Sequence, residues 1–229
     1  MDYFKMQISM VRFVQYSIIV MAMDEVFLAK IFQYLVIVLS AVFHEYAHGF
    51  MAFRLGDPTA KYEGRLTLNP LAHIDPVGTV ALPLFLLFTA GGFIGWARPV
   101  PYNPYNLQGK YGSLKVALAG PATNLLIALG ISLIIRFLAL YPDIFKFASS
   151  FLDFLILIAY INIFLGLFNL IPLPPLDGSK IFADLFPNQW QIVMQMGFMG
   201  IFIALFIAMY LLPPLADFIF RVFVGARFY

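Results

Sequence analysis

The segment between Lys30 and Arg54 constrains the fold more than any other part of this sequence. Residues 31–43 and 49–53 carry no charged side chain. A helix rises about 1.5 Å per residue, and the hydrocarbon core of a bilayer is about 30 Å thick. The segment is therefore long and apolar enough to cross a membrane as a helix.

A His-Glu-x-x-His motif interrupts this apolar segment at His44, Glu45 and His48. In a helix, two histidines four residues apart lie on one face, so both rings can reach one metal ion. Glu45 lies at the flank of that face, where its carboxylate can act on a water molecule without binding the metal. Along the helix, His44 is roughly 15 Å from Arg54 and roughly 21 Å from Lys30, which places the motif inside the hydrocarbon core. Ionisable groups at that depth indicate a functional site.

Composition extends the membrane interpretation to the rest of the chain. Only 11% of the residues are charged and 62% are hydrophobic, with a mean hydropathy of +0.88, whereas soluble proteins average about 25% charged residues. We therefore predict an all-α polytopic membrane protein. The net charge of +2 comes from scattered basic residues, so we expect no nucleic-acid partner. The chain has no cysteine, and a metal site must therefore use His, Asp or Glu.

Apolar runs separated by proline and glycine predict one bundle of five to six membrane-spanning helices. The expected spans cover about residues 27–54, 78–96, 113–140, 148–171 and 190–212. Residues 1–23 fit an interfacial helix, a further span, or an extension upstream of a start at Met23. Residues 24–229 are expected to form a single membrane-embedded domain.

The polar stretch after the first span is expected to contain a short β element. Gly56 and Pro58 end the helix, and the later prolines prevent another from forming. Apolar and polar residues alternate weakly from Tyr62 to Leu68, which predicts a strand or hairpin at residues 60–69. An unpaired edge of such a strand would be able to bind an extended peptide.

Catalytic zinc normally has three protein ligands and one open position, so the motif needs a partner from elsewhere. Asp177 is the strongest acidic candidate, because it follows a proline-broken end of the 148–171 span. Unwound backbone at membrane depth is tolerated only where it is buried in protein or lines a cavity. Asp177 suits the N-cap of a helix at 178–186 equally well. Spacing alone leaves both roles open.

Two distant motifs together carry a family resemblance. The sequence HEYAH at 44–48, followed by NLIPLPPLDG at 169–178, resembles the site-2 protease family of intramembrane zinc metalloproteases. The stretches 66–79, 95–104 and 120–124 also match, so the resemblance covers about residues 25–186. The chain is similar to the short bacterial or archaeal members without a PDZ or CBS domain. Ser179 departs from the Asp-Gly-Gly common in the family and leaves the expected ligand unaffected.

The resemblance implies a zinc ion on His44, His48 and Asp177, with Glu45 as the general base. It implies hydrolysis of peptide bonds within or near transmembrane segments by zinc-activated water, as in regulated intramembrane proteolysis. The expected partners are a membrane-spanning or membrane-anchored protein or peptide substrate and the lipid bilayer of the prokaryotic cytoplasmic membrane. The alternative is a membrane zinc-binding or transport protein. Transporters usually show internal repeats and several intramembrane acidic residues, and this sequence shows neither, apart from Asp153.

Three further polar residues lie in the matched motifs. Asn124 is expected to support a metal ligand, and Asn169 to support the unwound segment or to contact the substrate. Both also suit interhelical hydrogen bonding, because an amide inside a bilayer must find a partner. His73 is expected to be a loop or supporting residue, with competition for zinc as the alternative. Outside these motifs, Asn162 is expected to be a packing or interface residue.

Overall fold

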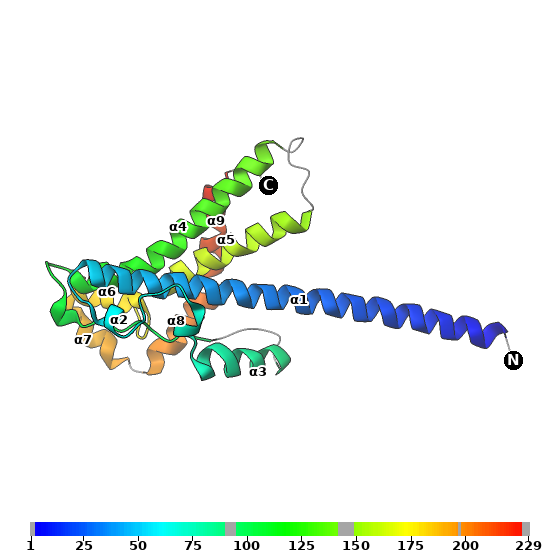
Figure 1. Cartoon of the computed structure of the whole chain (residues 1–229), viewed down its shortest axis with the longest axis horizontal. Coiled ribbons are helices and arrows are strands. Elements are labelled where there is room, and N and C mark those ends of the chain that lie inside the picture. The colour runs from blue at the N-terminus through cyan, green and yellow to red at the C-terminus, as the bar shows by residue number, and fades with distance from the viewer. Residues whose placement is uncertain (1–2, 90–94, 142–148, 197, 226–229) are drawn as a thin grey trace. The chain divides into compact units, whose positions relative to one another are not determined.

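The computed structural model describes residues 3–89, 95–141, 149–196 and 198–225 (Figure 1). The chain divides into two compact units, Met1–Val36 and Ile37–Tyr229. In the first unit the described residues form the N-terminal part of α1 (Tyr3–Arg54). Its position in or on a membrane, and the division of the chain into 1–23 and 24–229, stay predictions.

Three helices are long and apolar enough to cross a membrane. They are the Phe27–Arg54 part of α1, α4 (Gly112–Leu140) and the Phe151–Asn169 part of α5 (Ser149–Asn169). These confirm the spans expected at 27–54, 113–140 and 148–171. Each lies in an almost uninterrupted apolar run, which is the strongest signal that a sequence gives for a spanning helix.

The remaining spans differ from the prediction. The segment expected at 190–212 forms two helices, α7 (Pro187–Gln195) and α8 (Phe198–Tyr210), bent by 96° from each other. The segment expected at 78–96 begins as a π-helix, η2 (Pro76–Ala81), and continues as α3 (Leu82–Thr89). Together η2 and α3 rise only about 21 Å, which is too short for a bilayer. The described residues thus give three candidate spans, or four if the bent pair is one. Residues 90–94 of the segment expected at 78–96 lie outside the described residues, so the expected five to six spans stay a prediction.

The predicted β element is wrong. Residues 60–69 contain the end of helix α2 (Thr59–Tyr62) followed by turns, and they contain no strand. The backbone hydrogen bonds are local, since the amides of Arg65 and Leu66 both donate to the carbonyl of Ala60, at 2.8 and 3.1 Å. Gly64 adopts a left-handed φ of 66°, which also interrupts an extended run. A substrate strand therefore has no edge to pair with at this position.

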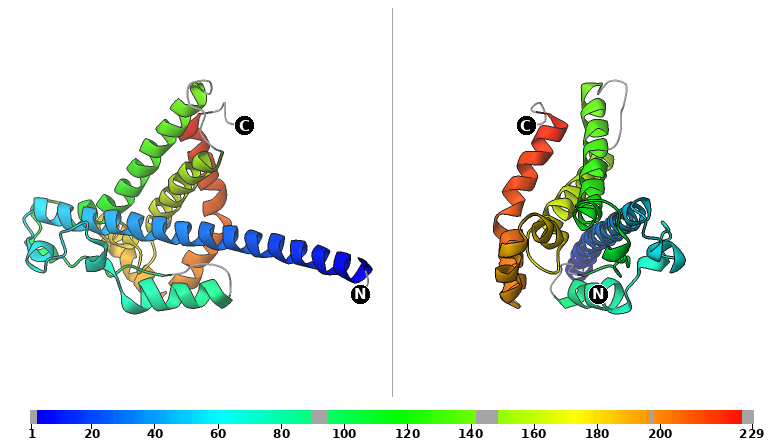
Figure 2. Two further views of the ribbon diagram at one scale, coloured as in Figure 1. Left: turned by 45° about the vertical axis from the view of Figure 1, so that its right-hand side comes forward. Right: turned by 90° about the vertical axis from the view of Figure 1, so that its left-hand side faces the viewer.

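The second unit is held by two apolar clusters. The first lies where α4, α5 and α9 (Leu212–Val224) pack together (Figure 2). Its buried members are Ala128, Ile135, Leu155, Ala159, Ile163, Ala216, Phe220 and Val224. The second cluster packs the loop after α5 against α8 and the start of α9, through Ile171, Leu173, Leu176, Ala204, Ala208 and Leu212. This loop leads directly into α6 (Asp177–Leu185), so the second cluster fixes where α6 begins.

Candidate metal centre

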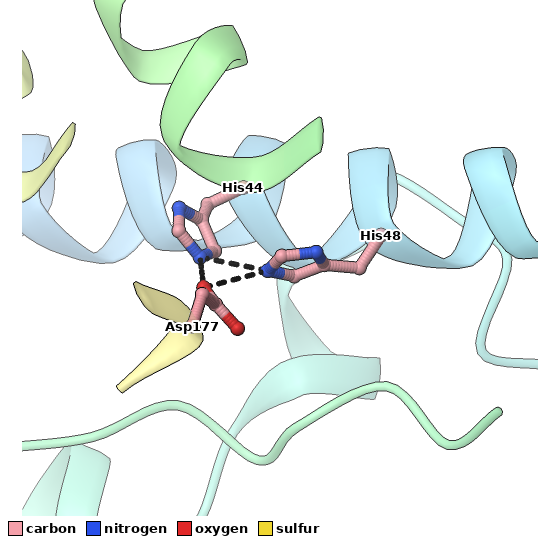
Figure 3. Close-up of side chains that lie close together, drawn as sticks. All are labelled: His44, His48 and Asp177. Atoms are coloured by element: carbon pink, nitrogen blue, oxygen red, sulfur yellow. Dashed lines mark hydrogen bonds and ion pairs between the residues drawn. The ribbon is translucent and has the colours of Figure 1, made fainter. Parts of the chain in front are cut away.

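His44 and His48 on α1 converge with Asp177 at the start of α6 (Figure 3). The Nε2 atoms of His44 and His48 each lie 3.0 Å from Oδ2 of Asp177 and 2.9 Å from one another. All three residues are buried, with at most 7% of each exposed. Their possible ligand atoms lie within 4.8 Å of one another, and no other described group of three or more His, Asp or Glu residues meets this criterion.

The outer nitrogen of each ring has its own partner. His48 Nδ1–H donates to the carbonyl oxygen of Val116 at 2.7 Å. A carbonyl can only accept, so the proton of the neutral ring lies on Nδ1 and the lone pair on Nε2. His44 Nδ1–H donates to Oδ1 of Asn124 at 2.6 Å. The Nδ2 of Asn124 donates to Oδ1 of Asn162 at 2.9 Å and to the carbonyl of Ser40 at 3.3 Å, which leaves Oδ1 as the atom facing His44.

Two imidazole lone pairs and a carboxylate oxygen therefore point at one small volume. Neutral Nε2 atoms cannot donate to each other or to the carboxylate, so without a cation the three groups repel one another. Two histidine nitrogens and one carboxylate oxygen form a typical donor set for catalytic zinc. Outer hydrogen bonds from the ligating rings, like those of His44 and His48, are equally typical. The residues present thus fit a zinc ion.

Two glycines permit this close approach. A Cβ atom on Gly120 of α4 would overlap the Nε2 atoms of both His44 and His48. A Cβ atom on Gly178 would overlap the backbone carbonyls of Leu170 and Ile171. Side chains at these positions would push α4 off the histidines, or push Asp177 out of the site.

The N-cap role considered for Asp177 is not observed. Leu176 holds the N-cap position of α6, and Asp177 is the first helical residue. The second carboxylate oxygen of Asp177, Oδ1, accepts from Lys180 Nζ at 3.2 Å. One oxygen of Asp177 therefore faces the histidines, and the other pairs with a half-exposed ammonium group.

The other residues selected from the sequence have different surroundings. The carboxylate of Glu45 is partly exposed and accepts a hydrogen bond from the amide of Val100 at 2.7 Å. Asn169 Nδ2 donates to the carbonyl of Leu165, one turn back in its own helix, and the structure does not bring it to the three candidate ligands. His73 is buried in the loops, where its Nε2–H donates to the carbonyl of Thr67 at 2.8 Å.

Asn162 was expected to be a packing or interface residue, and it belongs to the surroundings of His44. It is fully buried, and its Nδ2 donates to Oγ of Ser40 at 2.9 Å while its Oδ1 accepts from Asn124. Ser40 precedes His44 by one helical turn, so both side chains lie on the same face of α1. The spacing of Ser40 and His44, together with an asparagine inside an apolar span, was the sequence signal that could have linked Asn162 to the site.

Comparisons with known proteins agree with this chemistry. Residues 32–212 match Peptidase family M50. Three relatives carry the printed name "Putative zinc metalloprotease". YwhC of Bacillus subtilis is 43% identical over 159 residues, which cover 67% of this chain and 69% of YwhC. Rip2 of Mycolicibacterium smegmatis is 36% identical over 61% of this chain and 51% of Rip2, so the match spans about half of that relative. MJ0611 of Methanocaldococcus jannaschii is 31% identical over 81% of this chain and 92% of MJ0611.

No solved structure matches the chain. The family match covers most of the sequence, from α1 to the start of α9, and includes all three candidate ligands. The names of the relatives specify zinc, which is also the metal that the donor set fits. The chain therefore belongs to peptidase family M50, the site-2 protease family of membrane zinc metalloproteases.

Proposed function

We propose that this protein is an intramembrane-cleaving zinc metalloendopeptidase that uses His44, His48 and Asp177 as metal ligands and Glu45 as general base. One observation carries the proposal. Two imidazole lone pairs and a carboxylate oxygen meet in a buried site, on a helix apolar enough to cross a membrane. The catalytic glutamate expected from the motif is next to the first histidine on that helix.

The protein's own groups have distinct tasks in the proposed reaction. Zinc, when bound, supplies a Lewis acid that acidifies water and polarises a carbonyl group. Asn124 and Val116 hold the two imidazole rings with their lone pairs inward. Glu45 has one oxygen engaged by Val100, so the other can accept a proton from the attacking water. Glu45 then passes that proton to the nitrogen of the leaving amine as the peptide bond breaks.

The proposed substrates are membrane-spanning or membrane-anchored proteins or peptides. Every backbone group of a membrane helix is paired internally, so a substrate helix must unwind before its peptide bond reaches Glu45. The three apolar helices and the membrane-associated family support a multi-pass protein of the prokaryotic cytoplasmic membrane. Water and substrate would enter beside the polar segments 56–77 and 97–112. The second of these contacts the carboxylate of Glu45 through the amide of Val100.

A metal analysis and a cleavage assay on one set of variants test the proposal. Purified wild type should contain zinc and cleave a generic membrane-spanning peptide in liposomes. Glu45→Gln should keep zinc and lose cleavage, while Asp177→Ala should lose both. Asp217→Asn, which alters an exposed ion pair on α9, is the matched control and should behave as wild type. Cleavage that survives Glu45→Gln would contradict the proposal, and zinc flux without cleavage would favour the transport alternative.

A further inference from the structure

One peptide group outside the metal centre connects the catalytic glutamate to a buried arginine. The amide of Val100 donates to Oε2 of Glu45 at 2.7 Å. The carbonyl of the same peptide group, that of Pro99, accepts from Nη2 of Arg65 at 3.2 Å. The same nitrogen donates to the preceding carbonyl, that of Arg98, at 2.7 Å. The guanidinium of Arg65 therefore holds the carbonyl oxygen of this peptide group, and the N–H of the same group holds the carboxylate of Glu45.

The segment that carries this peptide group is held at several points. The amide of Arg98 donates to the carbonyl of His73 at 2.9 Å, and the amide of Asn103 donates to Oδ2 of Asp57 at 2.7 Å. The side chain of Val100 is buried and packs over Gly49, where an added Cβ would lie 2.9 Å from Val100 Cγ1. These contacts make the segment a fixed support for the face of α1 that carries Glu45.

Its sequence suits that role. Val100 lies between Pro99 and Pro101, and proline favours extended backbone both at its own position and at the residue before it. Proline also lacks an N–H, so Val100 provides the single amide donor of this tripeptide. That one donor is directed at Glu45.

Electrostatics strengthens the arrangement. Only 6% of Arg65 is exposed, and the contacts of its Nη2 are with carbonyl oxygens rather than with a carboxylate. A positive charge beside the carbonyl oxygen polarises the peptide group and makes its N–H a better hydrogen-bond donor. Hydrogen bonds to ionised groups are stronger than neutral ones, and linked bonds reinforce one another in a low dielectric.

We infer that Arg65 and the Pro99–Val100 peptide group position Glu45 for catalysis. The inference depends on the proposed function, because it takes Glu45 as the general base. The amide holds Oε2, so that the partly exposed side chain cannot rotate freely and Oε1 remains available to the water. Misplacement of a catalytic group by about 1 Å can lower the rate about 100-fold, so loss of this support affects turnover rather than substrate binding.

A matched pair of substitutions at Val100 separates the amide from the side chain. Val100→Pro removes the N–H and keeps the extended backbone that the neighbouring prolines favour. Val100→Ala keeps the N–H and removes side-chain packing. We expect Val100→Pro to lower kcat about 10-fold to 100-fold, as losses of outer hydrogen bonds commonly do, with KM and bound zinc unchanged. Val100→Ala should lower kcat less than Val100→Pro does, because it keeps the N–H that holds Glu45.

Substitutions of Arg65 test the other end of the peptide group and remain informative if Val100→Pro does not fold. Arg65→Gln should lower kcat without loss of zinc. Arg65→Lys should restore part of it, because the ammonium keeps a positive charge near the Pro99 carbonyl. If both residues act through one peptide group, Arg65→Gln combined with Val100→Pro should be no worse than Val100→Pro alone.

Hydrogen exchange supplies a readout that does not depend on activity. Because Val100 holds the one exchangeable amide of residues 99–101, its exchange should become faster in Glu45→Ala and in Arg65→Gln. Unchanged exchange, full kcat in Val100→Pro, or independent losses that multiply in the double variant would each overturn the inference. If wild type cleaves and Glu45→Gln does not, a fully active Val100→Pro overturns this inference alone. A wild type without cleavage overturns the proposed function and this inference with it.

Discussion

Asn124 determines which nitrogen of His44 is free, because its Oδ1 accepts the Nδ1 proton. Asn124→Ala removes that acceptor and lets the ring rotate or change tautomer. We expect the affinity for zinc to fall about 10-fold to 100-fold, the usual effect of losing such a bond. Competition against a chelator of known affinity measures it. Asn169→Ala is the control, since Asn169 bonds only within its own helix, and an equal loss there would contradict the assignment.

Asn162 influences Nδ1 of His44 indirectly, because it holds the side chain of Asn124, which bonds to that nitrogen. Asn162→Ala leaves the Nδ2 of Asn124 without its amide partner and the Oγ of Ser40 without its donor. Unsatisfied buried polar groups cost about 1–3 kcal/mol, so the variant should unfold at a lower temperature. It should also bind zinc more weakly than wild type but more tightly than Asn124→Ala. Zinc binding equal to that of wild type would show that Asn162 only packs, as the sequence had suggested.

Gly120 and Gly130 of α4 offer a direct steric comparison. A methyl group on Gly120 would overlap both ligating Nε2 atoms, whereas a methyl group on Gly130 would meet no atom within 4 Å. Gly120→Ala should therefore lose bound zinc and cleavage. Gly130→Ala should keep both and gain roughly 0.5–1 kcal/mol of stability, because alanine is the better helix former. Metal analysis and thermal unfolding of both variants check this expectation.

At the scale of elements, Asp57 joins the C-terminal end of α1 to the loops beside Glu45. It is fully buried, and its carboxylate accepts hydrogen bonds from Thr59, Asn103 and Asn106. Burial acts to raise the pKa of Asp57, but these hydrogen bonds outweigh it and hold the pKa below its ordinary value. The ionised form therefore stabilises the fold. Its contribution is fully present above the unfolded pKa of about 3.9 and is lost as the pH falls through the lower folded pKa.

Thermal unfolding between pH 3 and pH 6 tests this linkage. Wild type should lose stability as the pH falls below about 4. Asp57→Asn should be less stable than wild type above that pH and should show a shallower decline below it. Equal slopes for the two proteins would assign the acid sensitivity to other carboxylates.

The elements also show what the sequence alone can predict. Long apolar runs identified α4 and α5 and the spanning part of α1, because a bilayer imposes length and polarity directly. The strand predicted at 60–69 depended on weak alternation, which the local hydrogen bonds to Ala60 overrode. The span predicted at 78–96 contains Pro83 and follows Pro76, and its described part is too short to cross. Turn chemistry outweighed the weak alternation at residues 60–69, while the span predicted at 78–96 stays a prediction.

In the candidate site, too, the sequence predicted local geometry better than long-range contacts. Helical spacing predicted that His44 and His48 share a face, since that geometry is local. Spacing left Asp177 open between the roles of metal ligand and helix N-cap, and only the family resemblance favoured the ligand role. Asn162 was missed because its partners Asn124 and Ser40 lie 38 and 122 residues away. Such pairs arise from helix packing, which one sequence without related sequences does not reveal.

At the scale of the whole molecule, the bound metal should stabilise the fold. Without it, two lone pairs and a carboxylate face one another in a buried site, and a ligand that binds only the native state raises stability by mass action. Zinc removal by a chelator should therefore lower the unfolding temperature of wild type. Asp177→Ala should unfold at one temperature with or without chelator. A chelator effect of the same size in that variant would place the metal elsewhere.

The candidate ligands come from distant parts of the chain, since Asp177 lies 133 positions after His44. During synthesis, α1 reaches the membrane with both histidines long before the ribosome has made the aspartate. The sequences of α4 and α5 and of the loop after α5 are all made before that of Asp177. If the proposed function holds, a polypeptide that stops short of α6 lacks the third candidate ligand, and its metal site is incomplete.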